Sequence, residues 1–295
     1  MKQAIVGGNS LELSVAANSG KKEVFAVNTA FWDTVGSEAL GVTALPSWGG
    51  FLPDESRLKL LGDLTGKRVL EIGCGNGRSI EYAAKLGAAE LWGLDISANQ
   101  IEKTREYLHT KEINAHLICA PMEEECNLPK EYFDVIYSVF GIGWTTDLRK
   151  TFQRMYSYLK TGGIFVFGWS HPIHKCVSDE ENQFVIANSY FDESWYKAKI
   201  GNGEIAMSNR MLSTYINALA DAEFHIERLV EDNDTEKAVA AASDFGRKAL
   251  MLPTAFAIKS KKRSRFSLTF AGGWDIVDSS KKKGNRHEDT DCCVF

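Results

Sequence analysis

The sequence predicts an α/β fold in which a parallel sheet is doubly wound, with helices on both of its faces. Two observations support this prediction: short apolar runs alternate with helical patterns, and a glycine-rich turn follows the first run. The strand-like runs lie at residues 68–72, 91–94, 115–119, 133–139 and 163–168, and the helical patterns at 78–86, 98–109 and 146–159. Strands that alternate with helices in this way form parallel sheets, because each helix carries the chain back across one face.

The segment before the first strand predicts a cover for the sheet. Residues 1–30 are weakly patterned and rich in Gly, Asn, Ser and Ala, so we expect a loose lead-in there. Residues 28–41 predict a short helix with an aromatic face. Asp54 is expected to cap a helix over residues 55–62, since its carboxylate can accept a free amide of the first turn.

The chain after the fifth strand-like run predicts an insertion and then a pair of strands at the sheet edge. Lys160-Thr-Gly-Gly163 marks a helix end and a turn into that run. Residues 171–207 are polar and aromatic without a clear period, and we expect an insertion placed to cover a substrate. A helix over 208–221 precedes strands over 223–230 and 254–259, which are expected to pair in antiparallel fashion.

The chain therefore divides into three parts. We predict an N-terminal cover over residues 1–54, a main domain over 55–262 and a tail over 263–295. The tail is expected to be flexible and to lie outside the packed domain. Its last residues, Cys292-Cys-Val-Phe295, fit a prenylation pattern, and an unmodified tail is the other interpretation.

Composition narrows the class of protein. The chain has 295 residues, of which 44% are apolar, enough for one large domain with appendages. Its net charge of −5 gives no general attraction to phosphate backbones, so a nucleic-acid partner is disfavoured. No apolar run approaches the ~20 residues that span a bilayer, and no signal-peptide core is evident, so we expect a cytoplasmic protein. The six cysteines have no metal-ligand spacing, and reduced thiols without a metal site are expected.

The glycine-rich turn predicts a nucleotide-like ligand. It reads Glu71-Ile-Gly-Cys-Gly-Asn-Gly77, with a G-x-G-x-G spacing. Glycine permits positive φ, so the backbone can turn sharply and lie against a ligand. A dinucleotide site requires a small residue at the sixth position, and Arg78 stands there. A nucleoside with an amino-acid tail fits better, because it has no pyrophosphate and its hydroxyl and amino groups require carboxylates such as Glu71.

Asp95 supplies a second carboxylate. It ends the second strand-like run, in Gly93-Leu-Asp-Ile-Ser97, and we expect it beside the glycine turn. There it can accept hydrogen bonds from both hydroxyls of a ribose. The alternative is that Asp95 caps the following helix.

Together these residues resemble the class I S-adenosylmethionine-dependent methyltransferases. The features that carry the resemblance are VLEIGCGNG at 69–77, GLDIS at 93–97, PMEEE at 121–125, FDVIYSVFGIGW at 133–144 and LKTGGIFVF at 159–167. The resemblance implies a Rossmann-like sheet of seven strands in the order 3-2-1-4-5-7-6, with the last strand antiparallel. It also implies S-adenosylmethionine as the cofactor and methyl transfer as the reaction.

The resemblance also assigns residues to the cofactor. Asp95 would hold the ribose, while Ser138 would offer its carbonyl to the amino group. Pro121 stands where many members carry an Asp, so recognition of the adenine edge would depend on Met122 and Glu123. The residues expected at the cofactor are Glu71, Gly73, Cys74, Gly75 and Gly77 at the methionyl end, Asp95 at the ribose, Ile96, Met122 and Glu123 at the adenine, and Ser138.

The methyl acceptor is expected past the carboxyl ends of the strands. His171 is the candidate general base, because it follows the fifth run and histidine titrates near neutrality. The alternative is that His171-Pro172 only shapes a turn. The aromatic residues nominated as acceptor contacts are Trp48, Phe140, Trp144 and Trp169, together with Trp32 from the N-terminal cover. Each of them has the alternative of being ordinary core.

The predicted function is methyl transfer from S-adenosylmethionine to a small molecule by in-line displacement. An RNA or protein methyltransferase is the first alternative. Ser138-Val-Phe-Gly141 lacks the (Asp or Asn)-Pro-Pro-aromatic motif that holds a flipped base, which disfavours methylation of exocyclic base nitrogens. A non-catalytic module that binds the cofactor is the second alternative. The acceptor atom and the oligomeric state have no sequence signal.

Overall fold

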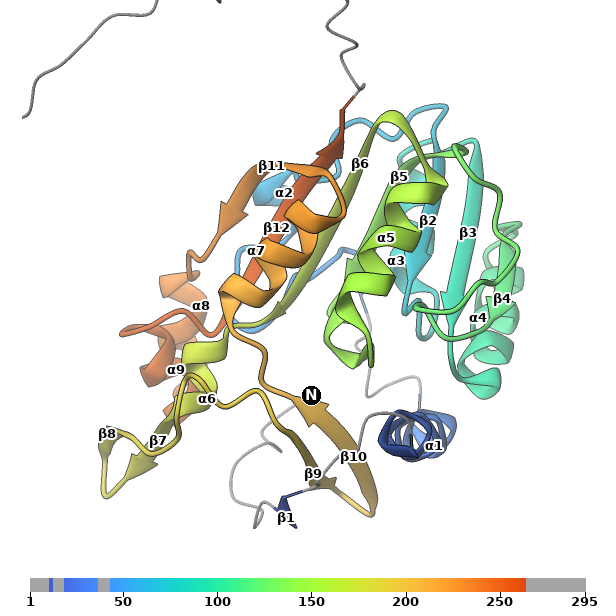
Figure 1. The fold of residues 1–295 in the computed structure, drawn as a ribbon. Helices are drawn as coiled ribbons and strands as arrows, with labels where there is room; N and C mark the ends of the chain where they lie inside the picture. Colours follow the sequence, from blue (N-terminus) through green and yellow to red (C-terminus); the bar gives the residue numbers. More distant parts are fainter. Residues whose placement is uncertain (1–10, 13–18, 37–42, 264–295) are drawn as a thin grey trace, which may run out of the picture. The chain divides into compact units, whose positions relative to one another are not determined.

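The computed structural model describes residues 11–12, 19–36 and 43–263 (Figure 1). The predictions for the tail, including the prenylation pattern, lie outside the described residues, as does the end of the helix expected over 28–41. In the part of the chain that is described, no helix combines the length and the apolar character that crossing a bilayer requires.

A seven-stranded sheet forms the centre of the fold. Its order is β11-β12-β6-β5-β2-β3-β4, which confirms the order 3-2-1-4-5-7-6 implied by the resemblance. The last strand, β12, runs antiparallel to both β6 and β11, and the pairs within β4-β3-β2-β5-β6 are all parallel. The strands are β2 (Arg68–Ile72), β3 (Glu90–Asp95), β4 (His116–Cys119), β5 (Phe133–Val139), β6 (Leu159–Ser170), β11 (Phe224–Val230) and β12 (Ala255–Lys262).

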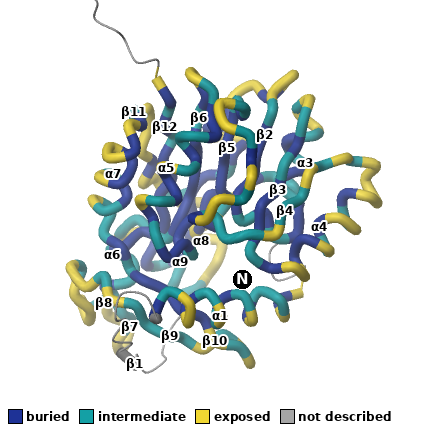
Figure 2. The backbone as a smooth tube through the Cα atoms, turned by 45° about the vertical axis from the view of Figure 1, so that its right-hand side comes forward, coloured by how far each residue is buried: buried dark blue, intermediate teal, exposed yellow. Residues whose placement is uncertain are grey.

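Helices cover both faces of this sheet, as the alternating pattern predicted. One face packs against α2 (Glu55–Leu58), α3 (Arg78–Lys85) and α4 (Ala98–Thr110), and the other against α5 (Leu148–Tyr158) and α7 (Leu212–Asp221). Successive strand residues point to opposite faces. In β6, Phe165 and Phe167 accordingly join the α5 side and Val166 the α3 side. Buried positions therefore run through the sheet, while the outer helix surfaces are exposed (Figure 2).

Several boundaries differ from the sequence predictions for local reasons. The helix expected over 55–62 ends at Leu58, because Lys59 adopts a left-handed φ of 49° and its N–H closes on the Glu55 carbonyl. The expected turn at 160–163 lies within β6, which begins at Leu159. The connection between β11 and β12 contains the short helices α8 (Thr235–Ala240) and α9 (Asp244–Ala249).

The insertion after β6 has regular structure that the sequence did not reveal. It contains α6 (Pro172–Cys176) and the hairpins β7 (Val177–Glu180) with β8 (Gln183–Ile186), and β9 (Trp195–Ile200) with β10 (Gly203–Ser208). Because β10 extends to Ser208, α7 begins at Leu212 and not at 208 as expected.

The expectation of a loose lead-in was wrong for residues 19–30. They belong to α1 (Ser19–Thr34), and β1 (Leu11–Glu12) pairs with β9. The helix lies across the lower edge of the sheet beside β10 (Figure 1). Asn28 fixes it there: its side-chain amide donates to the Ala206 carbonyl at 2.9 Å and accepts from the Ala206 N–H at 2.8 Å. The N-terminal segment and the insertion therefore form one cover.

We predict that Asn28→Ala lowers the free energy of unfolding by about 2–4 kcal/mol, because it leaves the buried N–H and C=O of Ala206 without partners. Urea denaturation measures the change. Asn202→Ala, in the exposed β9–β10 turn, is the control and is expected to stay within about 0.5 kcal/mol of the wild type. Equal losses in the two variants would contradict the assigned role of Asn28.

Candidate functional site

The predicted site residues come together at one edge of the sheet. The carboxyl ends of β2, β3, β5 and β6 meet at this edge, and α1 and the β9–β10 hairpin lie across it (Figure 1). Parallel strands bring their carboxyl ends to the same edge, so residues distant in sequence become neighbours.

The glycine turn of residues 73–77 requires glycine at each of its glycine positions. Gly73, Gly75 and Gly77 have φ values of 68°, 50° and 75°, in the left-handed region. A Cβ on Gly77 would lie 2.7 Å from Cγ2 of Thr104, whose hydroxyl donates to the Gly75 carbonyl at 2.6 Å. The N–H groups of Gly73 and Cys74 both donate to the Leu94 carbonyl, at 2.7 and 3.1 Å. The turn is therefore held against β3 and α4.

Asp95 joins the end of β3 to this turn. Its Oδ2 accepts from the Gly75 N–H at 2.9 Å and its Oδ1 from the Ser97 N–H at 3.0 Å. Ser97, and not Asp95, caps α4, since the Ser97 side chain accepts from the Gln100 N–H. Burial raises the pKa of Asp95, the amide hydrogen bonds lower it, and the nearby charge of Asp33 raises it further. A carboxylate has about four lone-pair sites, so Asp95 retains acceptor capacity for further donors.

Glu71 supports the turn from beneath. It is 2% exposed and faces Ser79 of α3 and the Tyr137 hydroxyl, which lies 3.4 Å from its Oε2. Burial raises its pKa well above the ordinary value, the hydrogen bonds from Ser79 and Tyr137 oppose this rise, and Asp95 adds to it. Cys74 is also buried on this face, where burial raises the pKa of its thiol.

The residues expected at the adenine and the amino group lie at the same edge with contacts of their own. Oε1 of Glu123 accepts from the N–H and hydroxyl of Thr146, at 2.7 and 2.6 Å, so this carboxylate is bound to the loop before α5. The Ser138 hydroxyl donates to the Ile72 carbonyl at 2.9 Å. Ile96 and Met122 are half-buried. Their roles toward a cofactor stay predictions.

A file of aromatic rings borders the glycine turn, and we call it the aromatic wall. Phe140, at the end of β5, is 37% exposed and lies 4.7 Å from the Trp169 ring centroid. Trp169 contacts Trp144 at 5.6 Å, and Trp144 contacts Trp32 of α1 at 5.1 Å, both edge to face. Trp144 belongs to a single 3-10 turn, η2 (Ile142–Trp144). Four of the five nominated aromatic residues thus come together: Phe140, Trp169, Trp144 and Trp32.

Trp48 lies apart from the aromatic wall. It is fully buried on the α2 side, and its Nε1 donates to Glu55 at 3.0 Å. The structure therefore favours the core alternative for this residue. Its neighbour Gly49 approaches the wall instead, since a Cβ there would lie 2.4 Å from the Phe140 ring.

His171 has both ring nitrogens engaged. Nε2 lies 2.6 Å from a Glu231 oxygen, and Nδ1 accepts from the Ile173 N–H at 3.2 Å, which caps α6. Burial lowers the pKa of His171, and Glu231 opposes this shift. With Nδ1 accepting, the neutral ring carries its proton on Nε2 and has no free acceptor for a substrate proton. This geometry favours the turn-shaping alternative over the role of general base.

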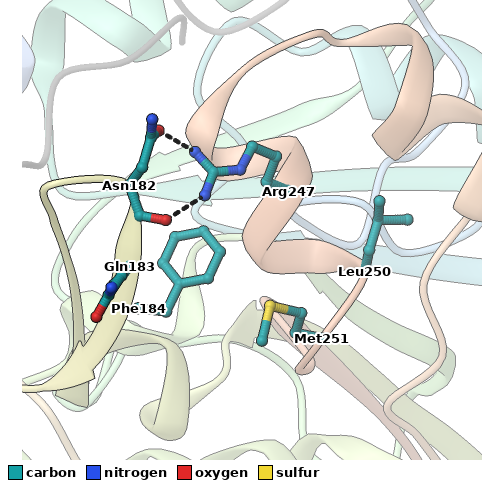
Figure 3. Close-up of a pocket in the computed structure, with 6 residues that line it drawn as sticks. All are labelled: Asn182, Gln183, Phe184, Arg247, Leu250 and Met251. Atoms are coloured by element: carbon teal, nitrogen blue, oxygen red, sulfur yellow. Dashed lines mark hydrogen bonds between the residues drawn. The ribbon is translucent and has the colours of Figure 1, made fainter.

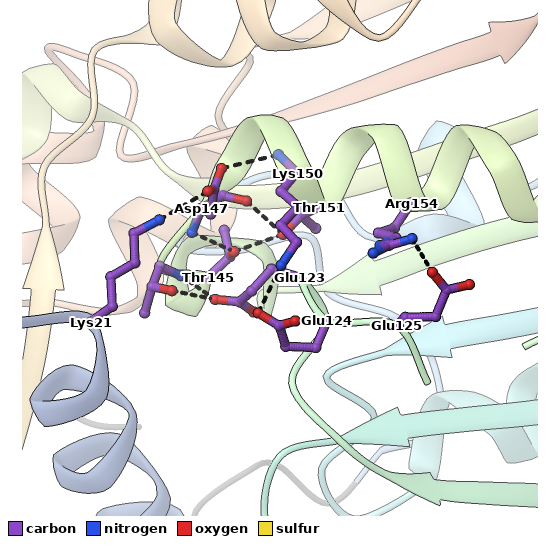
Figure 4. Close-up of polar contacts among 10 residues, drawn as sticks. Lys21, Glu123, Glu124, Glu125, Thr145, Asp147, Lys150, Thr151 and Arg154 are labelled. Carbon is purple, nitrogen blue, oxygen red and sulfur yellow. Dashed lines mark hydrogen bonds and ion pairs between the residues drawn. The ribbon is translucent and has the colours of Figure 1, made fainter. Parts of the chain in front are cut away.

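Of the α1 residues, Trp32 was nominated from the sequence, but Asp33 and Lys21 were missed because their contacts depend on distant segments. Asp33 accepts from the Ser97 hydroxyl and, at 3.4 Å, from the Asn99 N–H, while Gln100 donates to the Trp32 carbonyl at 2.8 Å. At the other end of the helix, Lys21 pairs with Asp147 at 2.9 Å (Figure 4). The sequence signal that could have identified Asp33 was its place directly after two aromatic residues, in Phe31-Trp32-Asp33.

Two hollows open on the described surface away from the glycine turn. One, of about 580 Å³, lies between α1 and the loop before α5 and is lined by Lys21, Lys22, Phe25, Glu123, Glu124, Thr146, Asp147 and Lys150. The other, of about 480 Å³, lies between the β7–β8 hairpin and α9, where Phe184, Leu250 and Met251 line it and Arg247 bonds to Asn182 (Figure 3). No predicted site residue lines the second hollow.

We predict that Gly77→Ala destabilises the fold by about 2–4 kcal/mol, from positive φ and the clash with Thr104 together. Gly62→Ala is the matched control, since Gly62 has a φ of 70° with open space around it and is expected to cost about 1 kcal/mol. Thr104→Ser, which removes Cγ2, is expected to recover part of the loss at Gly77. Equal losses at both glycines would show that the Thr104 contact does not matter.

We predict that Glu71→Gln flattens the pH dependence of stability. The pKa of Glu71 in the folded state lies well above its ordinary value of 4.5. In the pH window between the ordinary pKa and the raised pKa, the folded state therefore holds a proton that the unfolded state releases. Wild-type stability therefore falls as pH rises through the window, and the variant loses this contribution. Urea unfolding between about pH 5 and about pH 8 measures it, with Glu102→Gln, on an exposed face, controlling for the lost charge. Parallel profiles of wild type and Glu71→Gln would refute the assignment.

Comparison with known proteins bears on the region that holds this site. Residues 69–163 match the family model described as a methyltransferase domain. An uncharacterised protein of Haemophilus influenzae is 27% identical over 191 residues, which cover 59% of this chain and 73% of that protein. A ubiquinone biosynthesis O-methyltransferase of Bradyrhizobium is 32% identical over 112 residues, which cover 38% of this chain and 43% of the relative.

A solved S-adenosylmethionine-dependent methyltransferase of Mesorhizobium loti has the same fold, with a TM-score of 0.59 at 22% identity over 70% of this chain and 95% of that one. The chain spans about half the length of the curated O-methyltransferases that it matches. The chain therefore has the fold of this solved methyltransferase, and its residues 69–163 match a methyltransferase domain.

Proposed function

We propose that this chain transfers the methyl group of S-adenosylmethionine to a small-molecule acceptor. The observation that carries the proposal is the 2.9 Å hydrogen bond between Asp95 and the Gly75 N–H, which joins the glycine turn and a carboxylate at one edge of the sheet. The aromatic wall of Phe140, Trp169, Trp144 and Trp32 borders this pair.

The residues at this edge fit the cofactor. Gly73 and Gly75, at positive φ and half-buried, bring no side chain into the space beside the turn, while Gly77 makes room for Thr104. Asp95 retains lone pairs for the ribose hydroxyls after accepting two amides. Gly73, Gly75 and Gly77 would lie along the methionyl part, Ile96 and Met122 would border the adenine, and the Ser138 carbonyl would accept from the amino group. Glu71 would act through the turn, because it lies beneath it.

The chemistry requires little of the protein beyond alignment. The bound cofactor supplies a methyl group that its sulfonium already activates. The protein aligns the acceptor with this methyl and excludes water. Phe140, Trp144 and Trp169 give the acceptor side apolar ring surfaces, which suit a planar or apolar molecule. Ring faces also attract a positive sulfonium.

The acceptor atom would attack without His171. Both ring nitrogens of His171 are engaged, so the reaction does not pass a proton to it. An acceptor with an available lone pair, such as an ionised oxygen, meets this condition. The relative from Bradyrhizobium is named for methyl transfer to oxygen in ubiquinone biosynthesis, which supports an oxygen of a small molecule as the acceptor.

Calorimetry with S-adenosylhomocysteine tests the proposal. We expect the wild-type chain to bind it, and Asp95→Ala to weaken binding by about 10- to 100-fold, the effect of losing hydrogen bonds to a charged group. Asp63→Asn, at an exposed turn where Asp63 accepts only from Thr65, is the control and is expected to bind like the wild type. Absence of binding by the wild type, or unchanged binding by Asp95→Ala, would reject the proposed site.

A further inference from the structure

Arg210 forms hydrogen bonds with the backbone on both sides of Trp144. It follows β10 and is 8% exposed. Its Nη1 donates to the Gly143 carbonyl at 3.1 Å, and its Nη2 donates to the Thr145 carbonyl. The two accepting carbonyls belong to the residues immediately before and after Trp144. A single guanidinium therefore fixes the backbone of this one aromatic residue.

Beside these carbonyls, the buried Tyr215 hydroxyl also faces the Arg210 guanidinium. Within the described residues, no carboxylate forms an ion pair with it, whereas many of the surface arginines have one. Its guanidinium carbon lies 5.4 Å from the Trp195 ring centroid, a cation–π contact. Burying a charge is costly unless hydrogen bonds compensate. The carbonyls at the end of η2 supply that compensation.

The loop that Arg210 holds, residues 141–145, lies between the glycine turn and the aromatic wall. Gly141 precedes η2, and a Cβ on Gly73 would lie 3.3 Å from the Gly141 Cα. On the other side, a Cβ on Gly143 would lie 1.7 Å from the Trp169 ring, so the backbone presses against that ring. Trp144 itself contacts Trp169 and Trp32. A shift of the loop would therefore move the wall relative to the glycine turn.

We propose that Arg210 is a positioning residue for the methyl acceptor: it fixes Trp144 in the aromatic wall and so makes the inserted segment part of the acceptor site. Only the part of this role that concerns the methyl acceptor rests on the proposed function. The hydrogen bonds of Arg210 to the backbone beside Trp144 do not involve a ligand. Lysine cannot replace the arginine, since one ammonium lacks the planar fork that reaches two carbonyls at once.

The test compares Arg210→Ala and Arg210→Lys with the wild type by near-ultraviolet circular dichroism. The difference between wild type and Trp144→Phe defines the Trp144 band, which arises from the edge-to-face contacts with Trp32 and Trp169. We expect both Arg210 variants to lose most of this band. Arg154→Ala is the control and is expected to retain the band, because Arg154 lies on α5 and pairs with Glu125 away from the wall.

Chemical rescue separates positioning from general destabilisation. Millimolar guanidinium is expected to restore the Trp144 band of Arg210→Ala, whereas equal concentrations of ammonium or sodium chloride are not. Arg210→Lys keeps the length and the charge, so it provides a folded variant for the same comparison. A wild-type Trp144 band in Arg210→Lys, or no response of Arg210→Ala to guanidinium, would overturn the inference. Absent binding of S-adenosylhomocysteine by the wild type would instead reject the proposed function and leave the Trp144 result unaffected.

Discussion

The close approach of the 73–77 backbone to its neighbours is the constraint on which the rest of the site depends. The turn must pass under Thr104, against Gly141 and into reach of Asp95, and these close contacts together with positive φ favour glycine at Gly73 and Gly77. This packing sets where α3 begins and fixes the direction of the Asp95 carboxylate. Glu71 is buried beneath this turn, where hydrogen bonds from Ser79 and Tyr137 partly offset the cost that burial imposes on its charge.

A cover built from distant segments completes the edge. Asn28 binds α1 to β10, Asp33 binds it to the start of α4, and Lys21 binds it to the start of α5. Arg210, at the end of the same hairpin, grips η2 from the other side. The insertion and the N-terminal helix thus act on one place, the aromatic wall, although they are far apart in the sequence. Specificity for the acceptor would arise from this cover, and cofactor binding from the sheet.

The sequence predicted the parts whose determinants are local. The strands at 68–72 and 133–139 were correct to the residue, because continuous apolar runs between turn signals identify buried parallel strands. The glycine spacing likewise located the turn that positive φ requires. The sequence predicted a helix only from residue 28, and the first part of α1 was missed because the position of this helix depends on the contact of Asn28 with Ala206, 178 residues away. Trp48 and His171 were assigned to the site because their partners, Glu55 and Glu231, cannot be identified without the fold.

We propose that the edge formed by the glycine turn and Asp95 binds the adenosyl group and directs its sulfur toward the aromatic wall. A crystal structure of the chain with S-adenosylhomocysteine tests this most directly. We expect both ribose hydroxyls within hydrogen-bond distance of Asp95 and the sulfur facing Phe140, Trp144 and Trp169. A ligand bound elsewhere, such as in the hollow between the β7–β8 hairpin and α9, or a ribose that does not touch Asp95, would contradict it.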